Sequence, residues 1–353
     1  MRKQFFGLDF DIQTSIENKE KKLILLPNPE AQLQYQNSLA TLDEQSLQLL
    51  WSKSFFGINH TTQLFRIMYD TFNSKVNDIK TNDDILTVHA LFCDMIIRFG
   101  TIIEDFAGFC SACKRHVTEG TNIAEHFLAY SNPNQFYTDM LSKQGAEFIR
   151  QIFRIPQSQD DLDTIFTNLS AAEKELLWKG ISVTTEIISE RMKITAKSIV
   201  REQPTNFTLF DLYNKLKHGF APYYSYIFPI PITLTTTEIE TTNEEMVESY
   251  LIKFMLIMHN KLKGQMNNIE LQKLRVNKLA TCATTLIEAT KETADEILQT
   301  VIEIDYLYKY LVKRYITYAS GSKRILLLGS KDHLTIEESN DIETIISNDK
   351  RYT

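Results

Sequence analysis

Apolar residues recur every three or four positions along most of the chain after residue 30, which is the spacing of an amphipathic helix. The segment 83–114 is apolar on nearly all sides, which predicts a helix in a central, buried position. In the segment 61–79, one side of the helix collects Leu64, Ile67, Met68, Phe72 and Val76. Further helices are expected over 32–52, 123–130, 134–153, 243–263 and 269–318, the last of these open to an interruption.

Two helices have clear boundary signals. Ser170 and Glu173 form an S-x-x-E capping box, in which each side chain bonds the backbone N–H of the other residue. That helix is expected to continue to about residue 200, because Pro204 then breaks it. A shorter helix follows in the segment DLYNKLKHGF, residues 211–220. Gly219 suits the left-handed position after a helix, and Pro222 blocks continuation.

Three regions are expected to be non-helical. Residues 1–29 are predicted to be irregular or weakly extended, with a short strand-like run before Pro27. The β-branched stretch near 223–237 is the most strand-like region. The tail from residue 323 has room for a small strand and a last short helix. We therefore predict a mainly α fold, a multi-helix antiparallel bundle with a small extended or β element near 223–237. Its parts would be 1–29, 30–222, 223–240 and 241–353.

Composition agrees with this fold class. Among the 353 residues there are only 11 Gly and 8 Pro, whereas an all-β protein needs many turns marked by these residues. The formal net charge of −7 gives the chain no overall attraction to nucleic acid, so an RNA site would need a local basic patch. Four cysteines do not make a disulfide scaffold, and neither a secretory signal nor an uninterrupted membrane span is evident. These features predict a cytoplasmic protein without a membrane partner.

The most informative chemistry lies in the short helix. Asp211, Asn214, Lys215 and His218 share one helical face, so the amide of Asn214 and the imidazole of His218 could act on one phosphate or hydroxyl. A structural interpretation also fits these residues. Lys215, Lys217 and His218 lie in the last turn, where cations complement the helix dipole, and Asp211 and Lys215 are spaced as an ion pair.

The sequence YNKLKH, residues 213–218, resembles the Arg-Asn-x-x-x-His signature of HEPN domains, helical modules of many bacterial RNases, toxins and phage-defence proteins. The resemblance implies that His218 is the acid or base and that Asn214 orients the phosphate. Lys217, Lys215 and Tyr213 would then contact the substrate. Tyr213 stands where the family has arginine, and tyrosine lacks both the charge and the two-pronged geometry that bind phosphate. The departure puts catalysis in doubt.

Two other stretches carry candidate chemistry. The first contains zinc-type ligands in an apolar helical context that equally suits buried structural cysteine: Cys110, Cys113, His116 and His126. The second, residues 306–318, interleaves tyrosines with Lys309, Lys313 and Arg314. Such a pattern can bind single-stranded nucleic acid, although its apolar stripe also predicts a core helix.

Two functional hypotheses follow. The first is a HEPN-like helical protein of bacterial defence or stress response that binds, or less readily cleaves, RNA. The second is a non-enzymatic interaction or scaffold protein, with a homodimer as one form. Enzymatic activity stays open, and we expect no cofactor and no bound metal.

Overall fold

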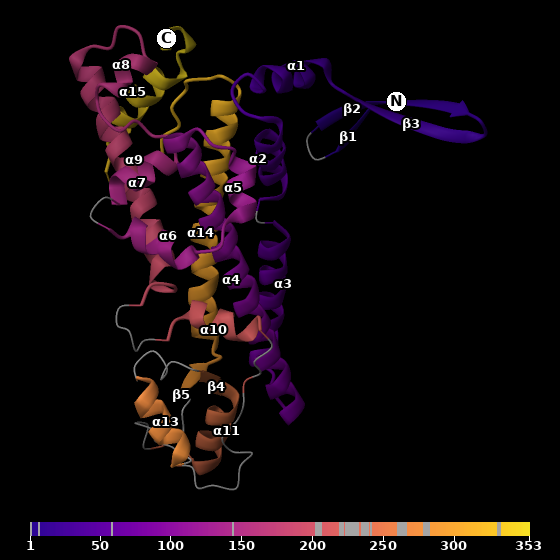
Figure 1. Ribbon diagram of the computed structural model, residues 1–353, viewed down its shortest axis with the longest axis vertical. Helices are drawn as coiled ribbons and strands as arrows, with labels where there is room; N and C mark the ends of the chain where they lie inside the picture. Colours follow the sequence, from indigo (N-terminus) through magenta and orange to yellow (C-terminus); the bar gives the residue numbers. More distant parts are fainter. Residues whose placement is uncertain are drawn as a thin grey trace.

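The computed structural model describes residues 2–5, 8–57, 59–142, 145–201, 207–218, 242–259, 267–277, 283–329 and 333–353, together with residues 222, 233 and 240. Helices dominate, so the predicted mainly α, multi-helix fold is confirmed (Figure 1). The helices are α1 (Pro29–Ser38), α2 (Glu44–Phe56), α3 (Asn59–Val76), α4 (Asn82–Glu119), α5 (Ile123–Ala129), α6 (Pro133–Met140), α7 (Gly145–Ile152), α8 (Asp161–Ile165), α9 (Ala171–Lys197), α10 (Leu209–Leu216), α11 (Asn243–Lys253), α13 (Asn268–Val276), α14 (Lys291–Ala319) and α15 (Ile336–Ser347). The strands are β1 (Arg2–Phe5), β2 (Leu8–Glu17), β3 (Glu20–Pro27), β4 (Phe254–His259) and β5 (Ala283–Glu288).

The bundle is built around α4, as its apolar sequence predicted. This helix of 38 residues packs against α3, α5, α6, α7, α10 and α14. Phe92, Phe99, Phe106 and Phe109 of α4 are fully buried in the core. By length and composition α4 is also the one helix of the described chain that could cross a membrane. A buried core helix meets the same criteria, and the contacts of α4 are compatible with a soluble protein.

Two of the predicted helices are each divided into two in the structure. The expected helix 32–52 is two helices, since the Asp43 side chain accepts the Ser46 N–H at 2.9 Å and starts α2 afresh. The expected helix 134–153 is divided into α6 and α7. The Ser170–Glu173 capping box is confirmed, with the Glu173 N–H donating to Ser170 Oγ at 3.3 Å and the Ser170 N–H to Glu173 Oε2 at 2.9 Å.

The N-terminal segment is a three-stranded antiparallel sheet in the order β1-β2-β3. The strand-like run expected before Pro27 is β3, but the rest of residues 1–29 is more regular than the irregular or weakly extended segment predicted. We call this sheet the arm, because it projects from the bundle beyond α1 (Figure 1). Asn18 and Lys19 have φ values of 53° and 69° and form the two-residue turn that joins β2 to β3. β2 alternates apolar and polar residues and has no continuous apolar run, so it was less evident in the sequence than β3.

A small lobe at the opposite end of the bundle corrects the prediction for the C-terminal region. The expected helix 243–263 ends at Lys253 and continues as β4, and the expected helix 269–318 is divided into α13, β5 and α14. Antiparallel pairing of β4 with β5 explains why the two expected helices are interrupted, because the backbone N–H and C=O groups of each strand bond those of the other. The extended element expected near 223–237 lies outside the described residues, apart from Thr233.

The chain's last part returns to the bundle. The last short helix is confirmed as α15, which packs against α9, and α14 packs against α2, α3, α4 and α9. The small strand expected in the tail from residue 323 does not form among the described residues 323–329 and 333–353. In the apolar run 325–328, side chains bond the backbone: Leu328 N–H donates to Thr184 Oγ1 at 3.0 Å, and Tyr310 OH donates to Leu326 O at 2.6 Å.

Candidate functional site

The start of α10 is fixed by a capping box that also occupies Asp211. Thr208 N–H donates to the Asp211 carboxylate at 2.9 Å, and Asp211 N–H donates to Thr208 Oγ1 at 3.1 Å. Arg201 approaches the same carboxylate from the preceding segment and donates two hydrogen bonds to it. Asp211 therefore serves helix formation, as an acid in the first helical turn commonly does.

Tyr213 and Lys217 attach α10 to α4. The ring of Tyr213 lies directly on Gly100, and its hydroxyl donates to Glu104 Oε2 at 2.8 Å. Lys217 Nζ donates to the other oxygen of Glu104 at 3.0 Å and lies 4.5 Å from the centre of the Tyr213 ring. Burial, and then the hydrogen bond to Glu104, raise the pKa of Tyr213. The residue at the position of the HEPN arginine is thus a buried, neutral packing residue.

Asn214 and His218 differ in their surroundings. Asn214 is half-buried, and its Nδ2 donates to the carbonyl of Phe210 in its own helix at 2.9 Å. His218 is exposed, and its backbone N–H donates to Lys215 O at 3.2 Å. Within the described part of the chain, no side chain hydrogen-bonds the His218 ring. Gly219, expected to end the helix in a left-handed conformation, lies outside the described residues. The hydrogen bond of Asn214 within its own helix agrees with the interpretation of these residues as structural.

The four zinc-type residues do not converge. Cys110 and Cys113 are fully buried within α4, and burial raises the pKa of both thiols. His116 Nδ1 donates to Thr121 O at 2.8 Å, and His126 lies 3.2 Å from Arg115 instead. No cluster of three or more metal-ligating side chains occurs among the residues that the structure describes.

Three of the five tyrosines of 306–318 belong to the core, whereas Tyr306 is 40% exposed and Tyr318 is half-buried. Tyr308, Tyr310 and Tyr315 are buried on α14, so they do not offer exposed rings on which bases could stack. Lys309 pairs with Asp305 at 2.6 Å on the same helix. Arg314 is buried as well, and it lines a basic cleft that the sequence did not predict.

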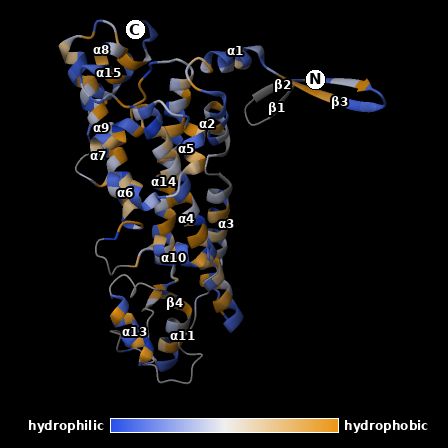
Figure 2. Ribbon diagram, viewed as in Figure 1, coloured by the Kyte–Doolittle hydropathy of each residue, from blue (hydrophilic) through white to orange (hydrophobic). Residues whose placement is uncertain are grey.

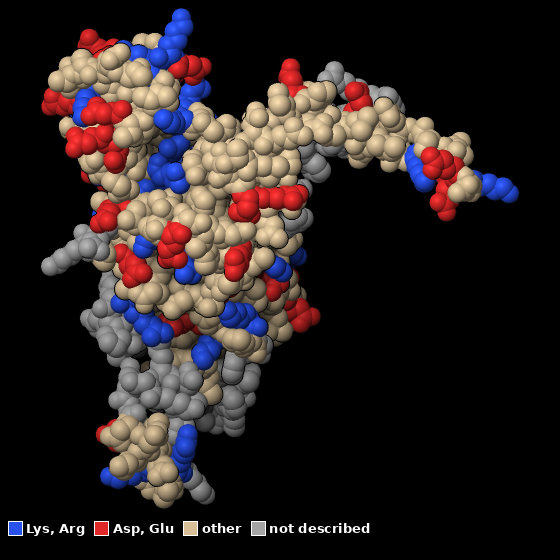
Figure 3. Space-filling view, turned by 45° about the horizontal axis from the view of Figure 1, so that its top comes forward, with Lys and Arg blue, Asp and Glu red and all other residues tan. Residues whose placement is uncertain are grey.

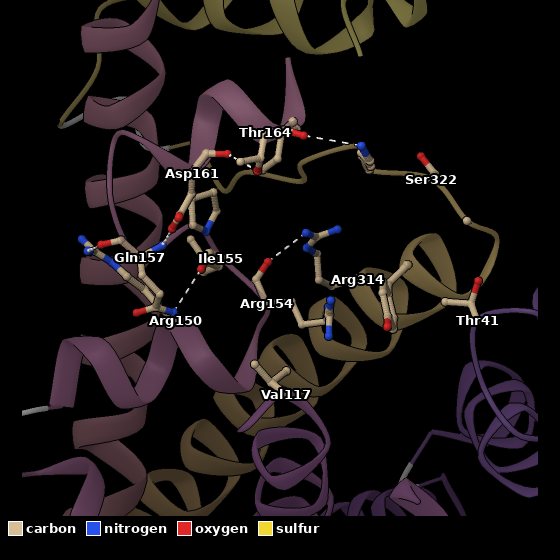
Figure 4. A pocket seen from close by; sticks show the side chains of 15 residues that line it. Thr41, Val117, Arg150, Arg154, Ile155, Gln157, Asp161, Thr164, Arg314 and Ser322 are labelled. Carbon is tan, nitrogen blue, oxygen red and sulfur yellow. Dashed lines mark hydrogen bonds between the residues drawn. The ribbon is translucent and has the colours of Figure 1, made fainter. Parts of the chain in front are cut away.

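Three arginines and a lysine line one cleft of about 620 Å³. Arg150 and Arg154 come from the end of α7 and the residues after it, and Arg314 comes from α14 (Figure 4). Lys323 lies in the segment that follows α14. Figure 3 shows Lys and Arg side chains gathered between the α8–α15 end of the molecule and the base of α1. The sequence signal was weak, because these residues lie in two stretches, 150–154 and 314–323, that are about 160 positions apart.

Comparison with protein-family models, with curated proteins and with solved structures finds no match for the chain. Kinship with HEPN domains therefore stays a prediction that depends on residues 213–218.

Proposed function

We propose that this chain is a non-enzymatic helical interaction protein that pairs with a second copy of itself through the arm. The observation that carries the proposal is an uncovered apolar strand. Leu23, Ile24, Leu25 and Leu26 of β3 are between 39% and 56% exposed, and Ile16 of β2 is 77% exposed. Figure 2 shows this apolar stretch on the projecting sheet. Leu33 of α1 and Leu39, the residue after α1, are exposed as well.

Consecutive apolar residues on a strand place two on each face, because side chains alternate. Strands with apolar residues on both faces are typical of sheets covered on both sides. A small sheet without a covered face is marginally stable in water, so the arm requires a partner. β3 is also an edge strand, with one row of backbone groups available for pairing. An identical β3 related by a two-fold axis supplies matching apolar residues and completes the ladder.

The test is the association state of the full chain. Wild type should sediment as a dimer at micromolar concentration. The double variant Leu23→Lys with Leu25→Lys, which charges one face of β3, should sediment as a monomer with an unchanged helical circular dichroism spectrum. The matched control is Leu128→Lys on α5, because Leu128 is 82% exposed but lies outside the arm. A monomeric wild type, or a double variant that dimerises normally, would contradict the proposal.

A HEPN-like RNA-binding protein is the second candidate. It is favoured by the exposed His218, which follows Lys217 at the end of α10. Cleavage, however, would lack the arginine that the family uses, because Tyr213 stands in its place and is buried and hydrogen-bonded to Glu104. The experiment compares RNA cleavage and cellular toxicity of wild type, His218→Ala and the control His333→Ala. Loss of activity in His218→Ala alone would support cleavage; equal activity, or none in any protein, would remove it.

A further inference from the structure

The cleft between α7, α14 and the segment after α14 concentrates positive charge in a chain whose net charge is −7. Its charged lining consists of Arg150, Arg154, Arg314 and Lys323, opposed by Asp161 alone. Asp161 is already occupied, since its carboxylate accepts the backbone N–H groups of Gln157 at 2.7 Å and Ser158 at 3.0 Å. None of the four cations forms an ion pair with a carboxylate of the described chain.

Arg314 is the most unusual of the four. Only 6% of it is exposed, and its guanidinium donates to two backbone carbonyls, of Arg324 and Arg154, each at 2.8 Å. Burial is the main cause that lowers the pKa of Arg314, and the like charge of Arg154 adds to it. A buried cation without a counter-ion is unfavourable, and a bound anion would remove that cost.

Arg154 occupies a backbone position that favours glycine. Its φ is 49°, and it follows α7 in a Schellman motif, with Ile155 N–H donating to Arg150 O at 2.9 Å. Left-handed backbone is disfavoured for arginine, so the side chain is retained there against a local preference. The guanidinium lies 3.5 Å from the centre of the Tyr318 ring, which holds it at the cleft.

Arg150 and Lys323 are held at the cleft by neutral partners. Arg150 donates to Thr185 Oγ1 at 3.2 Å and to Gln157 O at 3.3 Å, and its guanidinium lies over the Trp178 ring. Lys323 is exposed, and its Nζ donates to Thr353 Oγ1 at 2.9 Å. Neutral partners orient both side chains without cancelling their charges, so the cleft keeps a positive potential.

We propose that this cleft binds a small phosphate ester with at least two negative charges, such as a nucleoside diphosphate. Arginine offers paired donors that match phosphate oxygens, and three arginines with a lysine can balance more than one charge. The volume of about 620 Å³ exceeds that of a lone phosphate and is within the range of small-molecule sites. Ile155, Pro156 and Tyr318 add apolar surface for the organic part.

The experiment is isothermal titration calorimetry of the full chain with ADP, inorganic pyrophosphate and a 5′-phosphorylated single-stranded RNA of ten nucleotides. Wild type should bind ADP and pyrophosphate. Arg154→Gly should weaken ADP binding by about tenfold or more, because a charge-assisted contact is lost. The same change relieves the left-handed backbone, so the ligand-free melting temperature should stay within about 4 °C of wild type. Lys323→Gln, at an exposed position, should weaken ADP binding several-fold without affecting the fold.

The matched control is Arg66→Gln on α3, where an exposed arginine outside the cleft lies 3.8 Å from Asp305. Its affinity for ADP should equal that of wild type. Failure of wild type to bind ADP and pyrophosphate would overturn the proposal, as would unchanged affinity in both cleft variants. Binding of the RNA without ADP would overturn it too, by assigning the cleft to a polynucleotide. The association state of the arm is a separate measurement, so the two proposals can fail independently.

Discussion

At the scale of single residues, the junction between α4 and α10 depends on the absence of a side chain. A Cβ added to Gly100 would lie 2.0 Å from Cγ of Tyr213, which is far inside contact distance. The same ring carries the hydroxyl that bonds Glu104. Gly100 therefore allows the close approach that buries Tyr213, and Tyr213 in turn positions the helix that ends at His218.

We predict that Gly100→Ala destabilises the protein. Alanine in the middle of a helix is favoured over glycine by about 1 kcal/mol, but overpacking a core costs about 1–3 kcal/mol. A shift of the ring away from the added atom would also disturb its hydrogen bond to Glu104. The net loss should be about 1 kcal/mol in the free energy of unfolding, measured with urea. Gly329→Ala is the control, because nothing lies within 4 Å of the added atom. Equal stability of Gly100→Ala and wild type would show that α10 is not held by this contact.

At the scale of elements, most of the signals that the sequence predicted correctly are local, and the contacts it did not predict are mostly distant. The Ser170–Glu173 box and the apolar stripe of α4 act within one or two turns, so the sequence predicted both helices. The segment 254–259 became a strand because it pairs with residues 283–288, a partner that helical periodicity cannot reveal. The polar face of α10 was also predicted, but the acceptor that engages Tyr213 and Lys217 is Glu104, more than 100 positions away.

A histidine joins two of these elements. His89 of α4 is buried and lies 2.7 Å from the carbonyl of Ile252 in α11. A carbonyl only accepts, so Nε2 carries the proton in this bond. Burial lowers the pKa of His89, more than the bond to Ile252 raises it. The unfolded chain therefore takes up a proton at this residue first as pH falls, and stability should decline with pH from about 6.5 downwards.

We predict that His89→Gln removes part of this pH dependence. Wild type should lose more free energy of unfolding than the variant when urea titrations at pH 8 and pH 5 are compared. The other histidines are present in both proteins, so their contributions cancel in the comparison. An identical loss in the two proteins would mean that His89 does not titrate as a buried group.

At the scale of the whole molecule, the arm and the β4–β5 lobe lie at opposite ends of the bundle, with the basic cleft near the arm's end (Figures 1 and 3). Two copies joined through β3 would each carry a net charge of −7, which repels them. The arm contacts proposed to hold them are apolar, and salt does not screen apolar contacts.

Salt should therefore strengthen the dimer. Added salt shortens the Debye length from about 10 Å at 0.1 M to about 3 Å at 1 M. The shorter length weakens the electrostatic repulsion between the two copies and leaves the apolar contact intact. Sedimentation velocity at 0.1 M and 1 M NaCl should give a lower dissociation constant at 1 M. The Leu23→Lys, Leu25→Lys variant should remain monomeric at both concentrations, which separates the arm from non-specific salting-out. A dimer that weakens with salt would instead be held by ion pairs, for which the Lys22–Glu17 end of the hairpin is the nearest source. In that case the leucines of β3 would need another partner.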